Sequence, residues 1–270
     1  MSDFFTTCER AVRAAGEVLL KKWGRVTARE KGRFDLVTEA DLAAQEVVRR
    51  TVLEAFPDHA VLGEEDSIEK QKTCADRPYR WIVDPLDGTT NFVHGVPHFS
   101  VSLALEHEGE LLVGAVFNPL SGELFSAVRG DGANLNGESI RTSGVVSLGE
   151  ALGAVGFPPV VTDESPDFRL FVRAVKECQS IRRMGSVALN LSYLAAGRLD
   201  VAWSFSAKTW DVAAGVLLIS EAGGVVTAPD GGPVDLDRPG LIAAATADLH
   251  EAIRRLAAAE GLTGETNPTT

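Results

Sequence analysis

The chain is 270 residues long and 45% of its residues are hydrophobic, which is enough to form a substantial buried core. Its 38 acidic residues outnumber its 26 basic residues, so the formal net charge is -12 at pH 7. That charge disfavours binding to nucleic acid or to an anionic membrane. A phosphorylated substrate would need a cation to offset the repulsion, and acidic side chains can bind metal ions.

The cysteines and the N-terminal residues indicate the compartment. Cys8, Cys74 and Cys178 form no CxxC pair, and we interpret them as reduced thiols. Residues 1–10 contain acids where a secretory signal would have a basic segment followed by an apolar run. No stretch approaches the roughly 18 consecutive apolar residues of a membrane helix. We therefore expect a cytoplasmic protein.

The hydrophobic periodicity predicts helices and strands in an order typical of an α/β (α+β) protein. Apolar residues spaced by three and four predict helices, and short apolar or alternating runs predict strands. The predicted helices are 3–23, a helix between Thr38 and Pro57, 164–177, 186–196 and 210–222. The predicted strands are 81–83, an antiparallel meander over 99–105, 111–117 and 124–128, a strand near 180, and 199–205. We expect one domain over residues 1–262 and a flexible tail over residues 263–270.

Residues 84–92, with the sequence DPLDGTTNF, give the strongest chemical signal. The predicted strand ends at Asp84, and a turn stiffened by Pro85 presents Asp87 three residues later. Gly88 and Thr89 open a predicted short helix, whose free N–H groups favour an anion such as phosphate. An Asp-Gly pair by itself is more often a tight turn in which the aspartate caps a helix. This block alone leaves both interpretations open.

Two other acidic positions are equally ambiguous when each is considered alone. Glu64 belongs to the run GEED after the apolar residues 60–62, and such runs are commonly solvated surface. Asp211 lies in the first turn of the predicted helix 210–222, where a carboxylate also stabilises the helix dipole by ~0.3–1 kcal/mol. Whether Glu64 and Asp211 belong to a functional site therefore depends on the other motifs in the chain.

Three blocks, in this order along the chain, together resemble the inositol monophosphatase family. They are residues 63–65 (GEE), 84–92 (DPLDGTTNF) and 210–215 (WDVAAG), and the resemblance extends to about residue 255. It implies a layered αβαβα sandwich of the inositol monophosphatase and fructose-1,6-bisphosphatase type. It also implies a magnesium-dependent, lithium-sensitive phosphatase that forms a homodimer.

The resemblance further implies a set of metal ligands. Glu64, Asp84 and the backbone carbonyl of Leu86 would hold one Mg²⁺, while Asp84, Asp87 and Asp211 would hold a second. Oxygen ligands suit two or three Mg²⁺ ions, with Mn²⁺ as a possible substitute, and the sequence has no Cys/His cluster typical of zinc.

By the same resemblance, Thr89 paired with Asp41 would orient the attacking water, and Glu64 would share the role of base. Asp41 also fits a capping box begun by Thr38, so catalysis and helix capping are both open. Residues 31–34 correspond to a loop that closes over the metals in the family, although a plain connector is an equal alternative. The implied substrate-binding residues are Asp87, Gly88, Thr89, Gly185, Ser186, Val187, Ser204 and Asp211.

The substrate itself stays open. Thr90 stands where enzymes acting on adenosine bisphosphates, and the related histidinol-phosphate phosphatases, tend to have lysine, which favours the inositol branch. Ser204, however, stands where inositol-specific members usually have a glutamate that binds ring hydroxyls. Losing that partner could change preference by ~1.5–3 kcal/mol, toward another polyol phosphate or fructose bisphosphate. A non-catalytic regulatory protein on the same scaffold is a further alternative.

Overall fold

A computed structural model describes residues 1–75 and 77–262, and the predicted tail 263–270 lies outside the described residues. The helices are α1 (Ser2–Lys22), α2 (Glu39–Ala55), α3 (Ile68–Ala75), α4 (Thr89–Val93), α5 (Pro166–Glu177), α6 (Val187–Ala195), α7 (Thr209–Glu221) and α8 (Ala247–Ala259). The strands are β1 (Arg29–Gly32), β2 (Asp35–Val37), β3 (Ala60–Gly63), β4 (Tyr79–Asp87), β5 (Ser100–His107), β6 (Glu110–Asn118), β7 (Glu123–Val128), β8 (Gly132–Leu135), β9 (Glu138–Ile140), β10 (Leu152–Val155), β11 (Ser180–Arg182), β12 (Val201–Ser204), β13 (Val225–Thr227) and β14 (Leu241–Ala244).

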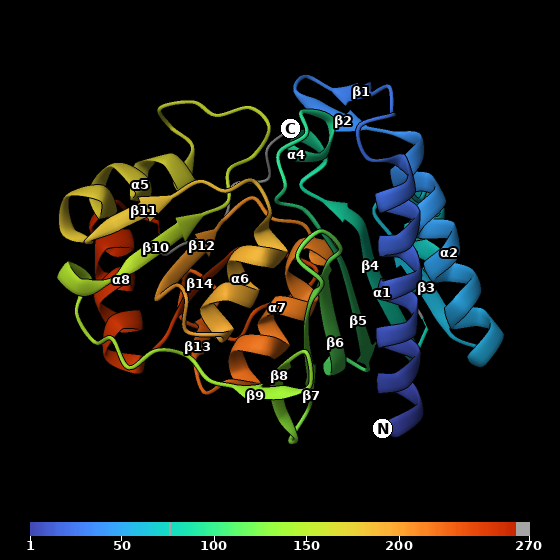
Figure 1. The fold of residues 1–270 in the computed structure, drawn as a ribbon. Coiled ribbons are helices and arrows are strands. Elements are labelled where there is room, and N and C mark those ends of the chain that lie inside the picture. The colour runs from blue at the N-terminus through green and yellow to red at the C-terminus, as the bar shows by residue number, and fades with distance from the viewer. Residues whose placement is uncertain (76, 263–270) are drawn as a thin grey trace.

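The helices and two large sheets are stacked in alternating layers. Figure 1 shows α5 and α8 at one end, followed by the smaller sheet, the pair α6 and α7, the larger sheet, and finally α1 and α2. Separate hydrophobic clusters fill the spaces between these layers. The layered αβαβα fold expected from the sequence is confirmed.

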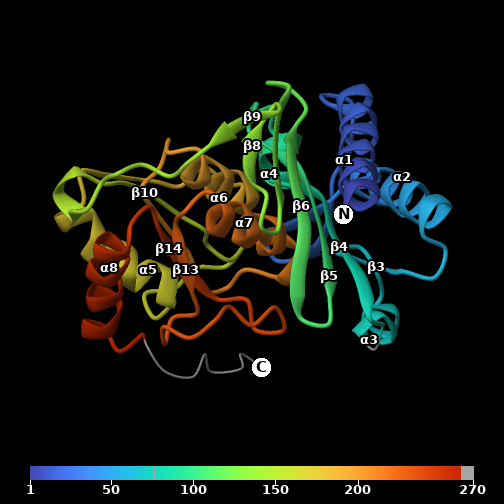
Figure 2. The ribbon, with the colours of Figure 1, turned by 90° about the horizontal axis from the view of Figure 1, so that it is seen from below.

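The larger sheet has the strand order β3-β4-β5-β6-β7-β8-β9. β3 pairs with β4 in parallel, and the following neighbours pair antiparallel, so the predicted meander over β5, β6 and β7 is confirmed. Figure 2 shows α3 beside β3 at one edge of this sheet, away from β8 and β9 at the other edge. β4 is longer than the predicted strand 81–83, because it continues through the acidic motif to Asp87.

The smaller sheet has the order β11-β10-β12-β14-β13 and mixes parallel with antiparallel pairs. The sequence predicted β11 and β12 but not β10, β13 or β14. All five strands of this sheet are only three or four residues long, and hydrophobic periodicity identifies such short runs in some cases and misses them in others.

The helices α6 and α7 lie between the two sheets and are therefore buried on most sides. They approach each other closely because Gly215 has no side chain: a Cβ there would lie 2.5 Å from Leu191 Cδ1. The glycine of the WDVAAG block thus serves helix packing. This packing fixes the first turn of α7, which carries Asp211.

All three cysteines are buried and free of disulfide bonds. Within residues 1–75 and 77–262, no helix is both long enough and apolar enough to cross a membrane.

Candidate active site

Acidic side chains from three separate elements form one cluster. Glu64 follows the end of β3, Asp84 and Asp87 belong to β4, and Asp211 lies in the first turn of α7. Burial raises the pKa of Asp84 well above its ordinary value, and the nearby charges of Glu64, Asp87 and Asp211 raise it further. The fold therefore brings together the four acidic residues that the sequence singled out.

A bulge in β4 explains the three-residue spacing of Asp84 and Asp87. Asp84 pairs with Ser102 and Asp87 pairs with Ser100, so three steps along β4 match two steps along β5. In a regular strand, residues three apart point to opposite faces of the sheet, but one extra residue restores the same face. Pro85 supports this irregularity because it has no N–H to donate to the neighbouring strand.

Asp87 is bound to the start of α6. Its Oδ2 accepts hydrogen bonds from Ser186 Oγ and from the Ala188 N–H at 2.7 Å, and its Oδ1 accepts one from the Val187 N–H at 3.2 Å. Burial raises the pKa of Asp87 to about 6, although these hydrogen bonds oppose the shift. The structure thus joins Asp87, which the resemblance assigned to both metal and substrate binding, to Ser186 and Val187, which it assigned to substrate binding.

Two glycines permit the close approach of α4 to this segment. Gly88 has φ of +99°, and a Cβ there would lie 3.2 Å from Gly185 O. Gly185 has φ of +86°, and a Cβ there would meet Asn91 Nδ2 at 2.9 Å. Asn91 donates to both His98 O and Met184 O, at 2.7 and 2.8 Å. Asn91 lies within the DPLDGTTNF block but was not among the site residues predicted from the sequence.

Asp41 takes part in the N-terminal cap of α2 and also contacts Thr89. Its Oδ2 accepts hydrogen bonds from the Thr38 N–H and Thr38 Oγ1, which completes the capping box of α2. Its Oδ1 accepts from Thr89 Oγ1 at 3.1 Å. Burial raises the pKa of Asp41, and the hydrogen bonds from Thr38 and Thr89 oppose that shift. The two interpretations left open by the sequence are therefore compatible.

Lys31 on the β1–β2 hairpin forms an ion pair with Glu64. Its Nζ lies 2.8 Å from Glu64 Oε1 and 2.8 Å from Glu65 Oε1. Burial raises the pKa of Glu64 to about 7, while the charge of Lys31 opposes that shift. A single ammonium thus offsets part of the charge of the acidic cluster.

The donors of the cluster suit a hard divalent cation, although the side chains are not arranged as a closed cage. Within the described part of the chain, no three His, Cys, Asp or Glu side chains converge closely enough to hold a metal ion. The reason is visible in the contacts: Glu64 is paired with Lys31, Asp87 faces α6, and Asp84 Oδ1 accepts the Leu86 N–H at 2.9 Å. Oxygen donors with mutually raised pKa values still fit Mg²⁺, because a cation relieves their repulsion.

Replacing Lys31 by methionine should strengthen Mg²⁺ binding, because an ion that reaches Glu64 must displace the lysine ammonium. We expect the Kd for Mg²⁺ to fall by about twofold to fivefold, as for the loss of one competing surface ion pair. Isothermal titration calorimetry measures this directly. Lys22→Met is the matched control, since Lys22 pairs with Glu39 at 2.7 Å outside the cluster. An unchanged or raised Kd in the Lys31 variant would contradict the competition.

A partly buried hydrogen-bond network fixes the turn that carries Glu64. Asp66 accepts from the Gly63 N–H at 3.0 Å and from Arg49 Nη2 at 2.7 Å. Gln45 Oε1 accepts the Glu65 N–H at 3.0 Å, and a Cβ on Gly63 would lie 2.2 Å from that same oxygen. The sequence analysis missed these residues; the only local signal was that Gln45 and Arg49 lie four apart and so share a helix face.

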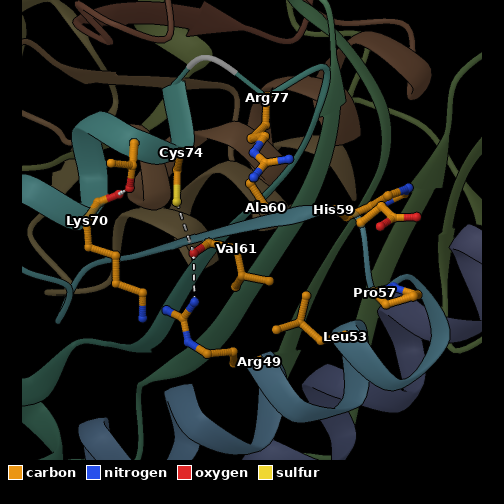
Figure 3. Close-up of a pocket in the computed structure, with 11 residues that line it drawn as sticks. Arg49, Leu53, Pro57, His59, Ala60, Val61, Lys70, Cys74 and Arg77 are labelled. Carbon is orange, nitrogen blue, oxygen red and sulfur yellow. Dashed lines mark hydrogen bonds between the residues drawn. The ribbon is translucent and has the colours of Figure 1, made fainter.

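The cavity shown in Figure 3, of about 330 Å³, is adjacent to this network but separate from the acidic cluster. α2, β3 and α3 contribute its walls, including Arg49, Lys70 and Cys74, and none of the clustered acids lines it. Arg49 donates to Val61 O at 3.0 Å and to Asp66, so the cavity wall supports the Glu64 turn from behind.

Ser204 lies at the end of β12, next to the start of α6. It is buried, and the position of a Cβ on Gly156 would be 2.8 Å from both Ser204 Oγ and Val187 Cγ2. The structure therefore places Ser204 near Val187, another residue that the resemblance assigned to substrate binding.

Comparisons with known proteins agree with this arrangement. The sequence model of the Inositol monophosphatase family matches residues 1–261. The chain is 43% identical to Nus factor SuhB of Pseudomonas aeruginosa, covering 91% of this chain and 93% of that protein. It is 42% identical to inositol-1-monophosphatase of Rhizobium meliloti, covering 86% of this chain and 88% of that protein. The solved structure of an IMPase from Thermotoga maritima has a TM-score of 0.83 and 35% identity, covering 94% of this chain and 96% of that one. The chain therefore belongs to the inositol monophosphatase family.

Proposed function

We propose that the chain is a magnesium-dependent phosphatase that hydrolyses a small, inositol monophosphate-like phosphate monoester and releases inorganic phosphate. The observation that carries this proposal is the cluster of Glu64, Asp84, Asp87 and Asp211 beside the Thr89–Asp41 pair, in which Asp84 and Asp87 are buried and the other two acids are partly buried. Buried acids that mutually raise their pKa values are typical of functional sites. Membership of the inositol monophosphatase family supports the same chemistry.

The metal ligands would be divided between two positions. Glu64, Asp84 and the Leu86 carbonyl would hold one Mg²⁺, and Asp84, Asp87 and Asp211 would hold another, with Mn²⁺ as a substitute. Bound Mg²⁺ supplies Lewis acidity and lowers the pKa of a coordinated water. Asp87 is oriented for this role by the N–H groups of α6. Ser186 and Val187 would therefore influence the substrate mainly through Asp87.

Thr89 and Asp41 would orient the attacking water. The Thr89 hydroxyl donates to Asp41 Oδ1, which leaves its oxygen lone pairs free to accept a hydrogen bond from water. Because Thr38 holds the other oxygen of Asp41, the carboxylate stays fixed while the water is positioned. Such positioning directs the lone pair of the water toward phosphorus for an in-line attack.

A phosphate-release screen tests the proposed function. Inositol, sugar, amino-alcohol and nucleotide monophosphates would be supplied with Mg²⁺, and again after exhaustive chelation. We expect turnover of several small esters with Mg²⁺, none after chelation, and inhibition by millimolar lithium. Full activity after chelation would contradict the metal-dependent mechanism. Insensitivity to lithium would only assign the chain to an atypical branch of the family.

Ser204→Glu should increase the preference for inositol monophosphate. A longer acidic side chain beside Val187 could accept hydrogen bonds from ring hydroxyls, which serine is too short to reach. We expect kcat/KM for inositol monophosphate to rise about tenfold relative to glycerol phosphate, or ~1.4 kcal/mol. Competition between both substrates in one reaction measures the ratio. Ser204→Gln has the same length without the charge and should gain less; a flat ratio in both variants would mean that Ser204 does not face the substrate.

A regulatory role is the second candidate function. The name Nus factor SuhB, carried by a relative 43% identical to this chain, favours it. A purely regulatory protein would have no need to keep all four acids of the cluster, so we rank catalysis first. We further propose that residues 1–262 form one domain that works as a cytoplasmic homodimer, with the β1–β2 hairpin as a lid over the site.

A further inference from the structure

The first turn of α5 contacts the chain immediately after Ser204. Asp167 is fully buried, and its carboxylate accepts the Phe205 N–H at 2.7 Å and Ser206 Oγ at 2.8 Å. Its backbone carbonyl also accepts a hydrogen bond from Trp203 Nε1 at 3.3 Å. A single residue of α5 therefore holds three of the four positions 203–206 at the end of β12, all except Ser204 itself.

This contact determines which way Ser204 faces. Trp203 and Phe205 are buried in the hydrophobic cluster that α5 and α8 form against the smaller sheet. Neighbouring residues of a strand point to opposite faces, so Ser204 points away from that cluster and toward Val187. Fixing Phe205 and Ser206 thus fixes the position of Ser204 relative to the start of α6.

The first turn of α5 also reaches the segment before Gly185. The Phe168 ring lies 6.4 Å from the Phe157 ring, and the Arg183 guanidinium stacks 5.2 Å from the centroid of Phe157. α5 therefore contacts the end of β12 directly, and it is linked through Phe157 to Arg183 in the segment that precedes Gly185. Figure 1 shows α5 at the outer end of the molecule, beside β11.

A buried aspartate is a costly way to obtain stability alone. Within residues 1–75 and 77–262, no lysine or arginine forms a salt bridge with Asp167, and burial raises its pKa to about 6. A buried acid held only by neutral donors gives little net stability compared with an apolar side chain of similar size. Buried polar contacts do, however, specify one local geometry.

We propose that Asp167 is a positioning residue for substrate specificity, which acts through Phe205 and Ser206 to set the wall of the substrate pocket at Ser204. This proposal rests on the proposed phosphatase function and concerns the alcohol part of the ester. The phosphate side of the site depends on the acidic cluster, which Asp167 does not contact. Changes at Asp167 should therefore alter recognition of the alcohol without altering recognition of phosphate.

Binding equilibria of the Mg²⁺-loaded full-length chain test this assignment. The two probes are inorganic phosphate and a phosphonate analogue of inositol 1-phosphate, which cannot be hydrolysed. We expect Asp167→Ala and Ser206→Ala to weaken phosphonate binding about fivefold relative to phosphate, as for one or two lost hydrogen bonds. Asp167→Asn should stay within about twofold of wild type, because its amide oxygen still accepts the Phe205 N–H and its NH₂ can donate to Ser206 Oγ.

Controls separate positioning from general destabilisation. Thr51→Val removes a hydroxyl that donates to Val47 O at 2.8 Å in α2, and it should leave the ratio of the two affinities unchanged. If Asp167→Ala does not fold, Ser206→Ala carries the test. Folded variants that keep the wild-type ratio, or that weaken both ligands equally, would overturn the proposal. A wild-type chain that binds neither probe would instead contradict the proposed function, and the role of Asp167 would fall with it.

Discussion

Asp84→Asn and Thr89→Ala should both abolish most turnover, but only the first should weaken metal binding. Asp84 is buried at the centre of the cluster and is assigned to both metal positions, so its loss removes a ligand from each. We expect Mg²⁺ affinity to fall at least about tenfold in Asp84→Asn. Thr89 contacts Asp41 and the Leu86 carbonyl through its hydroxyl, and its assigned partner is the water. Its loss should lower kcat about 10²-fold or more with metal affinity within about twofold.

Calorimetric Mg²⁺ titrations and steady-state kinetics on the same preparations measure both quantities. Thr90→Ala is the matched control for Thr89→Ala, because Thr90 is the adjacent residue of α4 and is exposed. It should behave as the wild type does. Equal losses of metal affinity in the Asp84 and Thr89 variants would contradict the assignment of ligand and water-orienting roles.

The metal-free chain should lose stability as the pH rises from about 4 to about 7, and Mg²⁺ should reverse that loss. Burial raises the pKa of Glu64 from 4.5 to about 7 and that of Asp87 from 3.8 to about 6. In this pH window the folded chain binds more protons than the unfolded chain, so the free energy of unfolding decreases with rising pH. At 100 times its Kd, Mg²⁺ should add about 2.7 kcal/mol and raise the Tm by about 5–10 °C.

Thermal unfolding at pH 5 and pH 7.5, with Mg²⁺ or with NaCl of equal ionic strength, measures this effect. Asp84→Asn is an informative comparison, because it removes one of the repelling charges. The metal-free variant should be more stable than the metal-free wild type at pH 7.5, while Mg²⁺ should stabilise it less. A metal-free wild type that is more stable at pH 7.5 than at pH 5 would show that the cluster does not control the stability of the fold.

Local sequence was sufficient to predict the structure wherever a single segment contains all the residues that define it. The DPLDGTTNF block predicted a strand end, two acids and a short helix, and β4 and α4 contain them in that order. The long helices α1 and α2 were predicted closely because each has an extended apolar stripe against the larger sheet. The family and the layered fold followed from these segments and from the order of the three blocks.

Other features depend on residues far apart in the chain, and no local pattern encodes such contacts. Lys31 meets Glu64, Gln45 and Arg49 hold the Glu64 turn, and Asp167 meets Phe205 only because the tertiary structure brings separate elements together. Even the spacing of Asp84 and Asp87 becomes meaningful only when β5 shows the bulge between them. The sequence by itself determined which residues are chemically suited to bind a metal and a phosphate. The tertiary structure decided what holds each of them in place, because burial and long-range hydrogen bonds arise only when the layers are packed together.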